Sequence, residues 1–327
     1  MGMFLSTKTL LTLVVLITIV FSVTIITHPA LSPAAAQGQQ YSFVTKWGSE
    51  GIGVGKFRQP LEIATDSDND LYVTDTTSVS NQVQKFATNG TFISSWGVLG
   101  FGDGRFTSAT SIDTDSSDNV YVTDGGSPET AVQKFTTDGT FITSWGSTGL
   151  GDGQFITPGG ITVDSSDNVY VGDFGENNRI QKFDGNGNLL AKWGTPGSGD
   201  GQFINPAALA ADSSDNIYVA DWGNNRIQKF DSNGNFLAKW GTLGSGDAQF
   251  IRPAGLAIDA SGNVFVVDEG NNRIQKFDSN GNFITRWGTP GSGDGQFEEP
   301  TSIALDSSGN AYVVDRGNSR IQAFAPS

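Results

Sequence analysis

The chain has 327 residues, no cysteine and one histidine, and its 34 acidic against 19 basic residues give a net charge of −15. Disulfides and cysteine-ligated metals are excluded, so the folded core alone must hold the chain together. Tight binding to nucleic acid normally starts from a basic patch, so the acidic balance predicts that nucleic acid is not a partner.

The first 36 residues have the pattern of a secretory signal peptide. Lys8 precedes an apolar run over residues 10–26, and Ala34-Ala35-Ala36 provides an A-x-A cleavage site. We expect cleavage after Ala36, leaving a monomer without a stable membrane span that is secreted or associated with the cell surface. The alternative is an uncleaved anchor, because the apolar run approaches the length that spans a bilayer.

Residues 37–327 contain no His, Met or Cys, because His28, Met1 and Met3 all precede the expected cleavage site. Catalysis by Ser-His-Asp or Cys-His groups requires an imidazole base. Both are excluded in the cleaved chain, and so are histidine-bound zinc and haem. The composition therefore favours a non-enzymatic protein.

A repeated unit fills the rest of the chain. Trp-Gly first occurs at Trp47 and returns every 47–49 residues, at Trp96, Trp145, Trp193, Trp240 and Trp287. One unit contains, in chain order, four apolar or β-branched segments: residues 209–212, 217–221, 226–230 and 236–240. A four-stranded meander that repeats every ~40–50 residues is the pattern of a β-propeller blade.

Turn-forming residues separate these strands. Ser-Ser-Asp-Asn stands between the first two strands of a typical unit, and Asn-Gly or Asp-Gly stands between the last two. Asn-Gly favours a type I′ turn, in which both central residues have positive φ. We therefore expect tight two-residue hairpins at Asn89-Gly90, Asp138-Gly139, Asn186-Gly187, Asn233-Gly234 and Asn280-Gly281.

The strand count predicts six blades and a closed ring. Tyr/Phe-Val-x-Asp, the second-strand phrase, occurs six times and ends at Asp75, Asp124, Asp173, Asp221, Asp268 and Asp315. A fourth strand is missing after the last third strand, which ends at Phe324. Residues 41–47 match the fourth-strand pattern and should pair with residues 319–324 to complete blade six. Such closure removes the exposed edges of an open sheet.

The repeated phrases resemble the NHL repeat. The fourth unit shows the match most fully, with Gly199-Asp200-Gly201-Gln202-Phe203, Pro206, Tyr218-Val219-Ala220-Asp221 and Asn224-Asn225-Arg226-Ile227-Gln228-Lys229-Phe230. The resemblance covers almost all of residues 41–324 and implies an all-β, six-bladed propeller of four-stranded antiparallel blades within residues 37–327. Units one and two depart most, because neither contains the Asn-Asn-Arg triplet and their loops after Asp75 and Asp124 are longer.

Relatives of this kind imply three functional classes. Some join the propeller to zinc-binding domains or bind RNA, which the absence of cysteine and the acidic charge oppose. Others resemble amidating lyases with a histidine-bound zinc, which a chain without mature histidine cannot form. Extracellular sensor or adhesion propellers, which bind ligands on one face, are the class that agrees with this sequence.

The residue directly after each second-strand Asp should stand at the mouth of the central channel. These residues are Thr76, Gly125, Phe174, Trp222, Glu269 and Arg316. Phe174 and Trp222 on neighbouring blades could form an aromatic platform for a sugar or an extended peptide. The alternative is that both rings simply pack on the adjacent blade. We take Phe174, Trp222, Glu269 and Arg316 as the candidate ligand-binding residues.

First strands line the axis, and two of their positions carry carboxylates. Glu62 and Asp113 fall on adjacent blades, where a hard cation such as Ca²⁺ could bridge them. Such a cation would resemble the channel metal of lactonase-type propellers, which this chain resembles in blade number only. The alternative is a solvated channel without a bound metal, and no other cofactor is expected.

Three functions follow from these observations. The first is a non-enzymatic extracellular binding or scaffold protein that holds a protein or glycan ligand on its loop face. The second is a metal-dependent hydrolase or lactonase that uses Glu62 and Asp113. The third is a purely structural component of the cell envelope. Near-identical units four and five favour the scaffold interpretations, because a catalytic centre requires units that differ.

Overall fold

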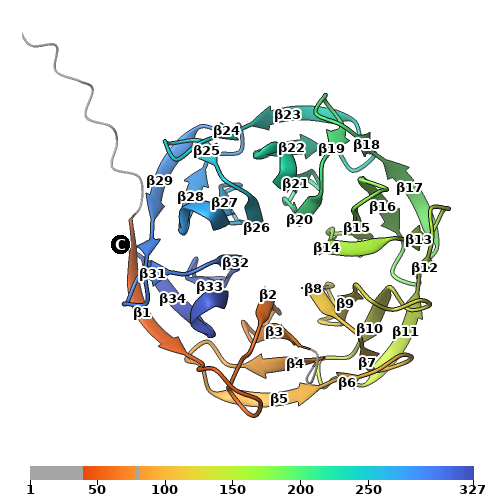
Figure 1. The fold of residues 1–327 in the computed structure, drawn as a ribbon, viewed down its shortest axis with the longest axis horizontal. Helices are drawn as coiled ribbons and strands as arrows, with labels where there is room; N and C mark the ends of the chain where they lie inside the picture. The colour runs from red at the N-terminus through yellow and green to blue at the C-terminus, as the bar shows by residue number, and fades with distance from the viewer. Residues whose placement is uncertain (1–39, 78–80) are drawn as a thin grey trace, which may run out of the picture. The chain divides into compact units, whose positions relative to one another are not determined.

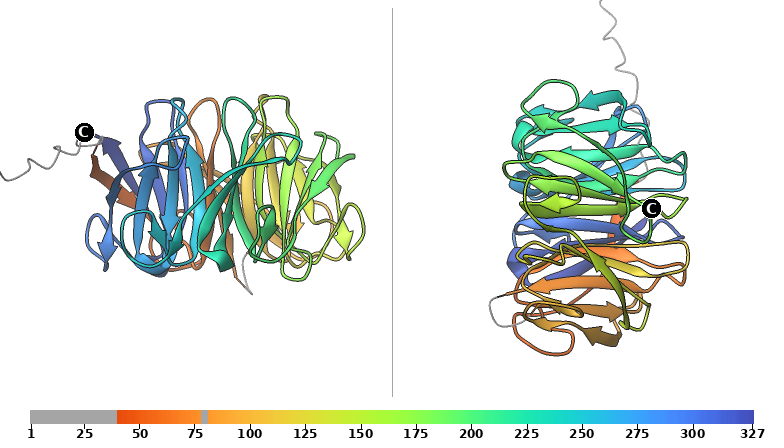
Figure 2. Two further views of the ribbon diagram at one scale, coloured as in Figure 1. Left: turned by 90° about the horizontal axis from the view of Figure 1, so that it is seen from above. Right: turned by 90° about the vertical axis from the view of Figure 1, so that its right-hand side faces the viewer.

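Six sheets of four antiparallel strands surround a central axis in the computed structural model (Figure 1). The structure describes residues 40–77 and 81–327, so the predicted signal peptide and its cleavage site lie outside the described residues. The strands run between the two faces of the ring, and loops project from both faces (Figure 2). No helix within the described ranges is long and apolar enough to cross a membrane.

The blades follow one another in chain order, each with its first strand at the axis and its fourth strand outermost. Blade one contains β2 (Pro60–Thr65), β3 (Leu71–Thr76), β4 (Asn81–Phe86) and β5 (Phe92–Trp96). Blade two contains β8 (Ala109–Thr114), β9 (Val120–Asp124), β10 (Val132–Phe135) and β11 (Phe141–Trp145). Blade three contains β14 (Thr157–Val163), β15 (Val169–Phe174), β16 (Arg179–Phe183) and β17 (Leu189–Trp193).

The second half of the ring repeats this order. Blade four contains β20 (Pro206–Ala211), β21 (Ile217–Asp221), β22 (Arg226–Phe230) and β23 (Phe236–Trp240). Blade five contains β26 (Pro253–Ile258), β27 (Val264–Asp268), β28 (Arg273–Phe277) and β29 (Phe283–Trp287). Blade six contains β32 (Pro300–Leu305), β33 (Ala311–Asp315), β34 (Arg320–Pro326) and, from the other end of the chain, β1 (Tyr41–Trp47).

Short parallel strand pairs and single-turn 3-10 helices complete the secondary structure. The pairs lie in the connections between blades: β6 (Val98–Leu99) with β7 (Arg105–Phe106), β12 (Ser147–Thr148) with β13 (Gln154–Phe155), β18 (Thr195–Pro196) with β19 (Gln202–Phe203), β24 (Thr242–Leu243) with β25 (Gln249–Phe250), and β30 (Thr289–Pro290) with β31 (Gln296–Phe297). The 3-10 helices follow the second strands of blades four to six: η1 (Trp222–Asn224), η2 (Glu269–Asn271) and η3 (Arg316–Asn318).

The ring closes through the predicted strand. β1 pairs antiparallel with β34, from Tyr41 opposite Pro326 to Trp47 opposite Ile321. Trp47 then packs on Tyr312 of blade six and on Phe86 of blade one. The prediction of a six-bladed all-β propeller closed by residues 41–47 is therefore confirmed.

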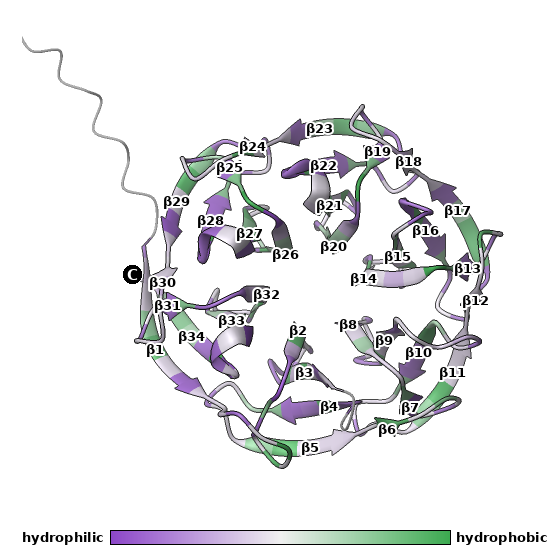
Figure 3. Ribbon diagram, viewed as in Figure 1, coloured by the Kyte–Doolittle hydropathy of each residue, from purple (hydrophilic) through white to green (hydrophobic). Residues whose placement is uncertain are grey.

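The hydrophobic core lies between blades. One cluster, for example, joins Tyr218 and Ile227 of blade four to Val264 and Phe277 of blade five. Outer strands such as β17 and β23 alternate half-buried and exposed residues, because only their inner faces meet this core (Figure 3). Each blade therefore depends on its neighbour for burial, which is why the ring must close.

The Asn-Gly and Asp-Gly hairpins differ from the prediction. Their glycines have φ between +83° and +85°, but the residues before them do not have positive φ. In blade one, Gly90 N donates to Ala87 O and Ala87 N donates to Thr91 O, both at 2.9 Å, so residues 88–90 form the loop. The loops are three-residue hairpins closed by a glycine bulge. The two-residue type I′ prediction was wrong, because the bulge needs a left-handed residue only at the glycine.

A buried polar network fixes the loop after each second strand in the later blades. In blade four Asp221 is fully buried and accepts from Ile204 N at 2.8 Å and from Arg226 Nε at 2.8 Å. Arg226 also donates to the carbonyl oxygens of Gly199 and Gln202 at 2.7 and 2.8 Å. This network ties the second strand to the connection from the preceding blade, so the residue after Asp221 has a fixed position at the channel mouth.

Candidate functional site

Four consecutive blades present the predicted loop residues at equivalent positions. Phe174 is the last residue of β15, and Trp222, Glu269 and Arg316 each begin a 3-10 helix. Each of these helices ends at a residue in the left-handed conformation, Asn225, Asn272 or Ser319, with φ of 52–53°. Asn tolerates this conformation better than most residues. The repeated loop therefore places four different side chains around one axis.

These four side chains line a single pocket of about 470 Å³ at the mouth of the channel. Its floor is formed by the first residues of the innermost strands and includes Glu62, Gly159 and Gly160. Gly160 is needed for packing, because a Cβ there would lie 2.7 Å from Ala207 O of the next blade. The structure thus brings Phe174, Trp222, Glu269 and Arg316 together as the sequence predicted, and their role in binding stays a prediction.

Direct contacts connect these residues across the blade boundaries. The rings of Phe174 and Trp222 lie 6.4 Å apart at an interplanar angle of 58°. Trp222 Nε1 donates to Glu269 Oε2 at 3.2 Å, and Arg316 Nη2 lies 3.6 Å from Glu269 Oε1. The two aromatic rings therefore pack on each other across the blade boundary and also line the pocket, and their use as a ligand platform stays a prediction.

Two charged side chains of the pocket, Glu269 and Arg316, are paired with each other. Glu269 is only 8% exposed, and its carboxylate lies between the indole N–H of Trp222 and the guanidinium of Arg316. Arg316 also donates to the exposed Glu299 at 2.9 Å. A buried carboxylate requires such partners, since desolvation of an unpaired charge is costly.

Arg252 is a pocket residue that the sequence did not reveal. Its guanidinium carbon lies 5.7 Å from the centre of the Trp222 ring, a cation–π contact. Its backbone has φ of 57°, and its N–H donates to Asn225 Oδ1 of blade four at 2.9 Å. The signal that could have found it is the variable residue before each first-strand proline: Gln59, Thr157, Asn205, Arg252 and Glu299. Of these, Thr157 and Arg252 line the pocket.

The corresponding residues of blades one and two lie outside this pocket. Thr76 Oγ1 donates to Ala109 O at 2.6 Å, and Gly125 N donates to Ser108 O at 2.8 Å. Both groups are thus used in contacts with the neighbouring connection. The candidate binding surface belongs to blades three to six at its rim, with blades one and two contributing to the floor.

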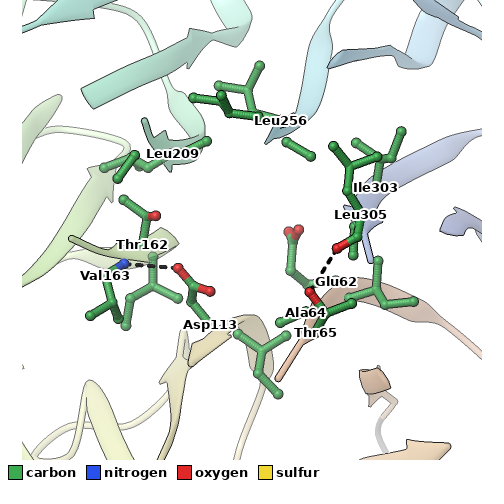
Figure 4. A pocket seen from close by; sticks show the side chains of 18 residues that line it. Glu62, Ala64, Thr65, Asp113, Thr162, Val163, Leu209, Leu256, Ile303 and Leu305 are labelled. Atoms are coloured by element: carbon green, nitrogen blue, oxygen red, sulfur yellow. Dashed lines mark hydrogen bonds between the residues drawn. The ribbon is translucent and has the colours of Figure 1, made fainter. Parts of the chain in front are cut away.

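Below the pocket, the channel contains a second cavity of about 240 Å³, and most of the residues that line it are aliphatic (Figure 4). Glu62 lines both cavities, whereas Asp113 lines only the deeper one. Glu62 is the third residue of β2, and Asp113 is the fifth residue of β8. At ~3.3 Å per residue, this offset separates the two positions by ~6–7 Å along their strands.

Burial in the channel raises the pKa of both carboxyl groups. The pKa of Glu62 rises to about 8 by desolvation, with a further rise from Asp113, and the hydrogen bond from Ser302 Oγ to Glu62 Oε1 opposes the shift. Desolvation raises the pKa of Asp113 to about 6, although Thr114 N and Val163 N each donate to it at 2.9 Å.

The donor set does not fit Ca²⁺. That cation takes six to eight oxygen ligands, and here two carboxylates at different depths face aliphatic side chains such as Leu209, Leu256 and Ile303 (Figure 4). No group of three or more His, Cys, Asp or Glu side chains converges on one point within residues 40–77 and 81–327. A cation bridge between Glu62 and Asp113 stays a prediction that this geometry does not favour.

Comparison with known proteins agrees with the architecture. Five segments match the family model described as NHL repeat: residues 57–86, 155–183, 203–230, 250–277 and 297–324. These segments lie in blades one, three, four, five and six. No curated protein matches the chain significantly in sequence.

Solved propellers are similar in structure at low sequence identity. A protein of unknown function from Bacteroides thetaiotaomicron has a TM-score of 0.67 at 18% identity, over 88% of this chain and 76% of that chain. An auxiliary nutrient binding protein from Bacteroides ovatus has a TM-score of 0.65 at 15% identity, over 88% and 77%. A gluconolactonase from Xanthomonas campestris has a TM-score of 0.61 at 12% identity, over 84% and 88%. Identities this low show the fold alone.

Proposed function

Because the chain belongs to the NHL repeat family and has a pocket over four of its blades, we propose that it is an extracellular, non-enzymatic binding protein. The ligand, a glycan or a segment of a protein, occupies the pocket between Phe174, Trp222, Glu269 and Arg316. The observation that carries this proposal is the convergence of an aromatic pair and an Arg–Glu–Arg set of charges on one concave surface.

The chemistry of the pocket suits a ligand with apolar faces and hydrogen-bonding edges. Aromatic rings bind the apolar face of a sugar ring or a planar peptide group. The guanidinium groups of Arg252 and Arg316 offer donors, and the carboxyl oxygens of Glu62 and Glu269 offer acceptors. A few polar groups in a mostly apolar pocket are the usual arrangement of a small-ligand site.

Extracellular location is supported by the leader pattern of residues 1–36 and by the acidic composition. An auxiliary nutrient binding protein among the structurally similar propellers agrees with a role in ligand capture. We propose a monomer, since the ring closes with its own strand. N-terminal sequencing of the exported protein, beginning at Gln37, would support cleavage of the leader.

The lactonase alternative lacks a comparable observation. It needs a metal held at Glu62 and Asp113, and those carboxylates are offset along the channel beside aliphatic walls. The structural similarity to a gluconolactonase extends to the fold only. We therefore do not put hydrolysis forward as a second function.

The experiment is a binding screen of the cleaved protein against glycan and peptide arrays, followed by calorimetry with each hit. Trp222→Ala and Phe174→Ala should each weaken binding at least about fivefold, since truncating an interface residue that carries binding energy costs more than about 1 kcal/mol. Leu237→Ala is the matched control, because Leu237 is 50% exposed on the outer strand of the same blade as Trp222. Hits that bind Trp222→Ala as tightly as the unaltered protein would place the ligand elsewhere.

A further inference from the structure

Five blades contain a largely buried lysine in the same place, with its side chain 3–15% exposed. It lies on the third strand with its ammonium 4.7–4.9 Å from the centre of the second-strand aromatic ring and 3.0–3.6 Å from the aspartate of the first turn. In blade four these residues are Lys229, Tyr218 and Asp212. The five lysines are Lys85, Lys134, Lys182, Lys229 and Lys276. Each ammonium thus has at least one carboxylate and one aromatic face; Lys85 also pairs with Asp70 at 3.0 Å, and Lys276 also lies over the ring of Tyr41.

Blade six keeps the ring and the carboxylate but lacks the lysine. Ala323 lies opposite Tyr312 in the strand register, just as Lys229 lies opposite Tyr218 in blade four. Tyr312 Oη donates to Asp306 Oδ2 at 2.9 Å, as the other tyrosines do to their aspartates. Asp306 forms no ion pair with any Lys or Arg of the described residues, unlike its counterparts in the other five blades.

A cavity opens where the lysine is missing. It has a volume of about 780 Å³ and lies between blades six and one, which are side by side where the ring closes (Figure 1). Ala323, Tyr312 and Asp306 line it from blade six, and Asp68 and Asp70 line it from blade one. Both walls therefore contribute carboxylates, and no Lys or Arg is among the lining residues. Asp70 is already paired with Lys85 of blade one at 3.0 Å, so Asp306 is the carboxylate that lacks the lysine of its own blade.

The facing hairpin offers a further acceptor. In the boundary between blades three and four, Lys182 Nζ also donates to Ser232 O of the next blade at 3.3 Å. Thr88 holds the position of Ser232 in the hairpin of blade one, and it lines the cavity. An ammonium beside Asp306 would thus meet the same kinds of group that surround the lysine of an intact boundary.

We propose that this cavity binds a primary alkylammonium group, which takes the place that lysine holds in the other five blades. The group comes from a small alkylamine or from a lysine side chain of a partner protein. Its ammonium pairs with Asp306 and lies over the ring of Tyr312. The site is separate from the channel-mouth pocket, so it does not depend on the proposed function.

The atoms that alanine lacks relative to lysine define the probe. They correspond to n-propylammonium, whose chain would continue from the methyl group of Ala323. Thermal unfolding of the cleaved protein is measured in n-propylammonium chloride and in NaCl at equal ionic strength, so that general screening of the acidic surface cancels. Binding to the folded state should raise Tm in the amine salt and not in NaCl.

Three variants make the test specific. Ala323→Lys should raise Tm in NaCl and lose the response to the amine, because its own side chain fills the site. Asp306→Asn should raise at least tenfold the concentration of n-propylammonium that is needed for a given increase in Tm. Lys229→Ala removes the lysine of blade four and so creates a second site of the same kind. Its Tm should rise more in n-propylammonium than that of the unaltered protein, which would show that the assay detects such a site.

The proposal is overturned if the unaltered protein gains no more stability in n-propylammonium than in NaCl, or if Ala323→Lys responds equally. A peptide with one lysine, compared with its Nε-acetylated form, distinguishes the two sources of the group. Binding of this peptide at least tenfold tighter than n-propylammonium would identify a protein partner, and weaker binding would identify a small amine.

Discussion

The indole N–H of Trp222 donates a 3.2 Å hydrogen bond to Oε2 of Glu269 and thereby joins blades four and five at the channel mouth. Glu269 is almost fully buried, and its other oxygen faces Arg316 of blade six. The orientation of the aromatic platform therefore depends on a carboxylate from the next blade. Ligand affinity and local stability should both respond to changes at Glu269.

Glu269→Ala should lower the free energy of unfolding by about 1–3 kcal/mol, because it removes the acceptor of the Trp222 indole and one partner of Arg316. Glu269→Gln should cost less, since an amide oxygen can still accept from the indole and the ion pair with the partly exposed Arg316 is worth under about 1 kcal/mol. Urea unfolding followed by tryptophan fluorescence measures both. Equal losses in the two variants would assign the effect to charge instead of the indole hydrogen bond.

Gly281→Ala should destabilise the protein more than Gly262→Ala. Both glycines belong to blade five and have similar backbone angles, φ of +83° and +79°. A Cβ at Gly281 would lie 2.6 Å from the ring of Trp240, whereas one at Gly262 would meet Ser279 at an ordinary 3.7 Å.

Gly262→Ala should thus cost about 1–2 kcal/mol for the left-handed backbone alone, and Gly281→Ala should add about 1–3 kcal/mol for overpacking. Urea unfolding of the two variants under the same conditions gives the difference. If the two losses agree within error, the close approach of Trp240 does not restrict this position.

The fold could be predicted because the same residues solve the same packing problem six times. Trp193 illustrates this: it contacts Tyr170 and Phe230 and leaves room only for a glycine at residue 234 of the next blade. A Trp-Gly at one end of a unit and an Asn-Gly before the next Trp-Gly are therefore two sides of one contact. Such coupling gives a strong signal in a single sequence.

Other features depend on geometry that the repeat does not encode. The Asn-Gly pair suits both a two-residue turn and a three-residue loop with a bulge, and only the hydrogen bonds of the loop and the φ of the residue before the glycine distinguish them. Arg252 reaches Trp222 across a blade boundary, so its role appears only when two loops are placed together. Ala323 in place of lysine is visible in the sequence, but the cavity beside it is not.

Glu62 should make stability depend on pH. Its pKa of about 8 in the folded protein exceeds the ordinary value of 4.5, so the folded state holds a proton that the unfolded chain releases. The free energy of unfolding should therefore fall as pH rises between those two values, by at most about 1.4 kcal/mol per pH unit. Above a pH of about 6, which is the pKa of Asp113, Glu62 should dominate the channel's contribution.

Urea unfolding of the unaltered protein and of Glu62→Gln between about pH 6 and pH 8 tests this. The stability of the unaltered protein relative to the variant should decrease with rising pH. Ser302→Ala, which removes the hydroxyl that donates to the carboxylate, should raise the pKa of Glu62 further and extend the decline to higher pH. Parallel profiles for the unaltered protein and Glu62→Gln would mean that water keeps Glu62 at its ordinary pKa.

Removal of β1 should open the ring. A chain that begins after Trp47 loses the partner of β34 and the contacts of Trp47 with Phe86 and Tyr312, which belong to different blades. An unpaired edge strand recruits other strands, so we expect dimers or aggregates and a loss of cooperative unfolding. Size-exclusion chromatography with light scattering and urea unfolding measure both, and the chain from Gln37 is the control.

A peptide of residues 41–47, added in trans, should restore a monomer because its register with β34 is already defined, whereas a scrambled peptide should not. A truncated chain that stays monomeric and as stable as the control would show that burial between blades, without the closing strand, is enough to hold the ring.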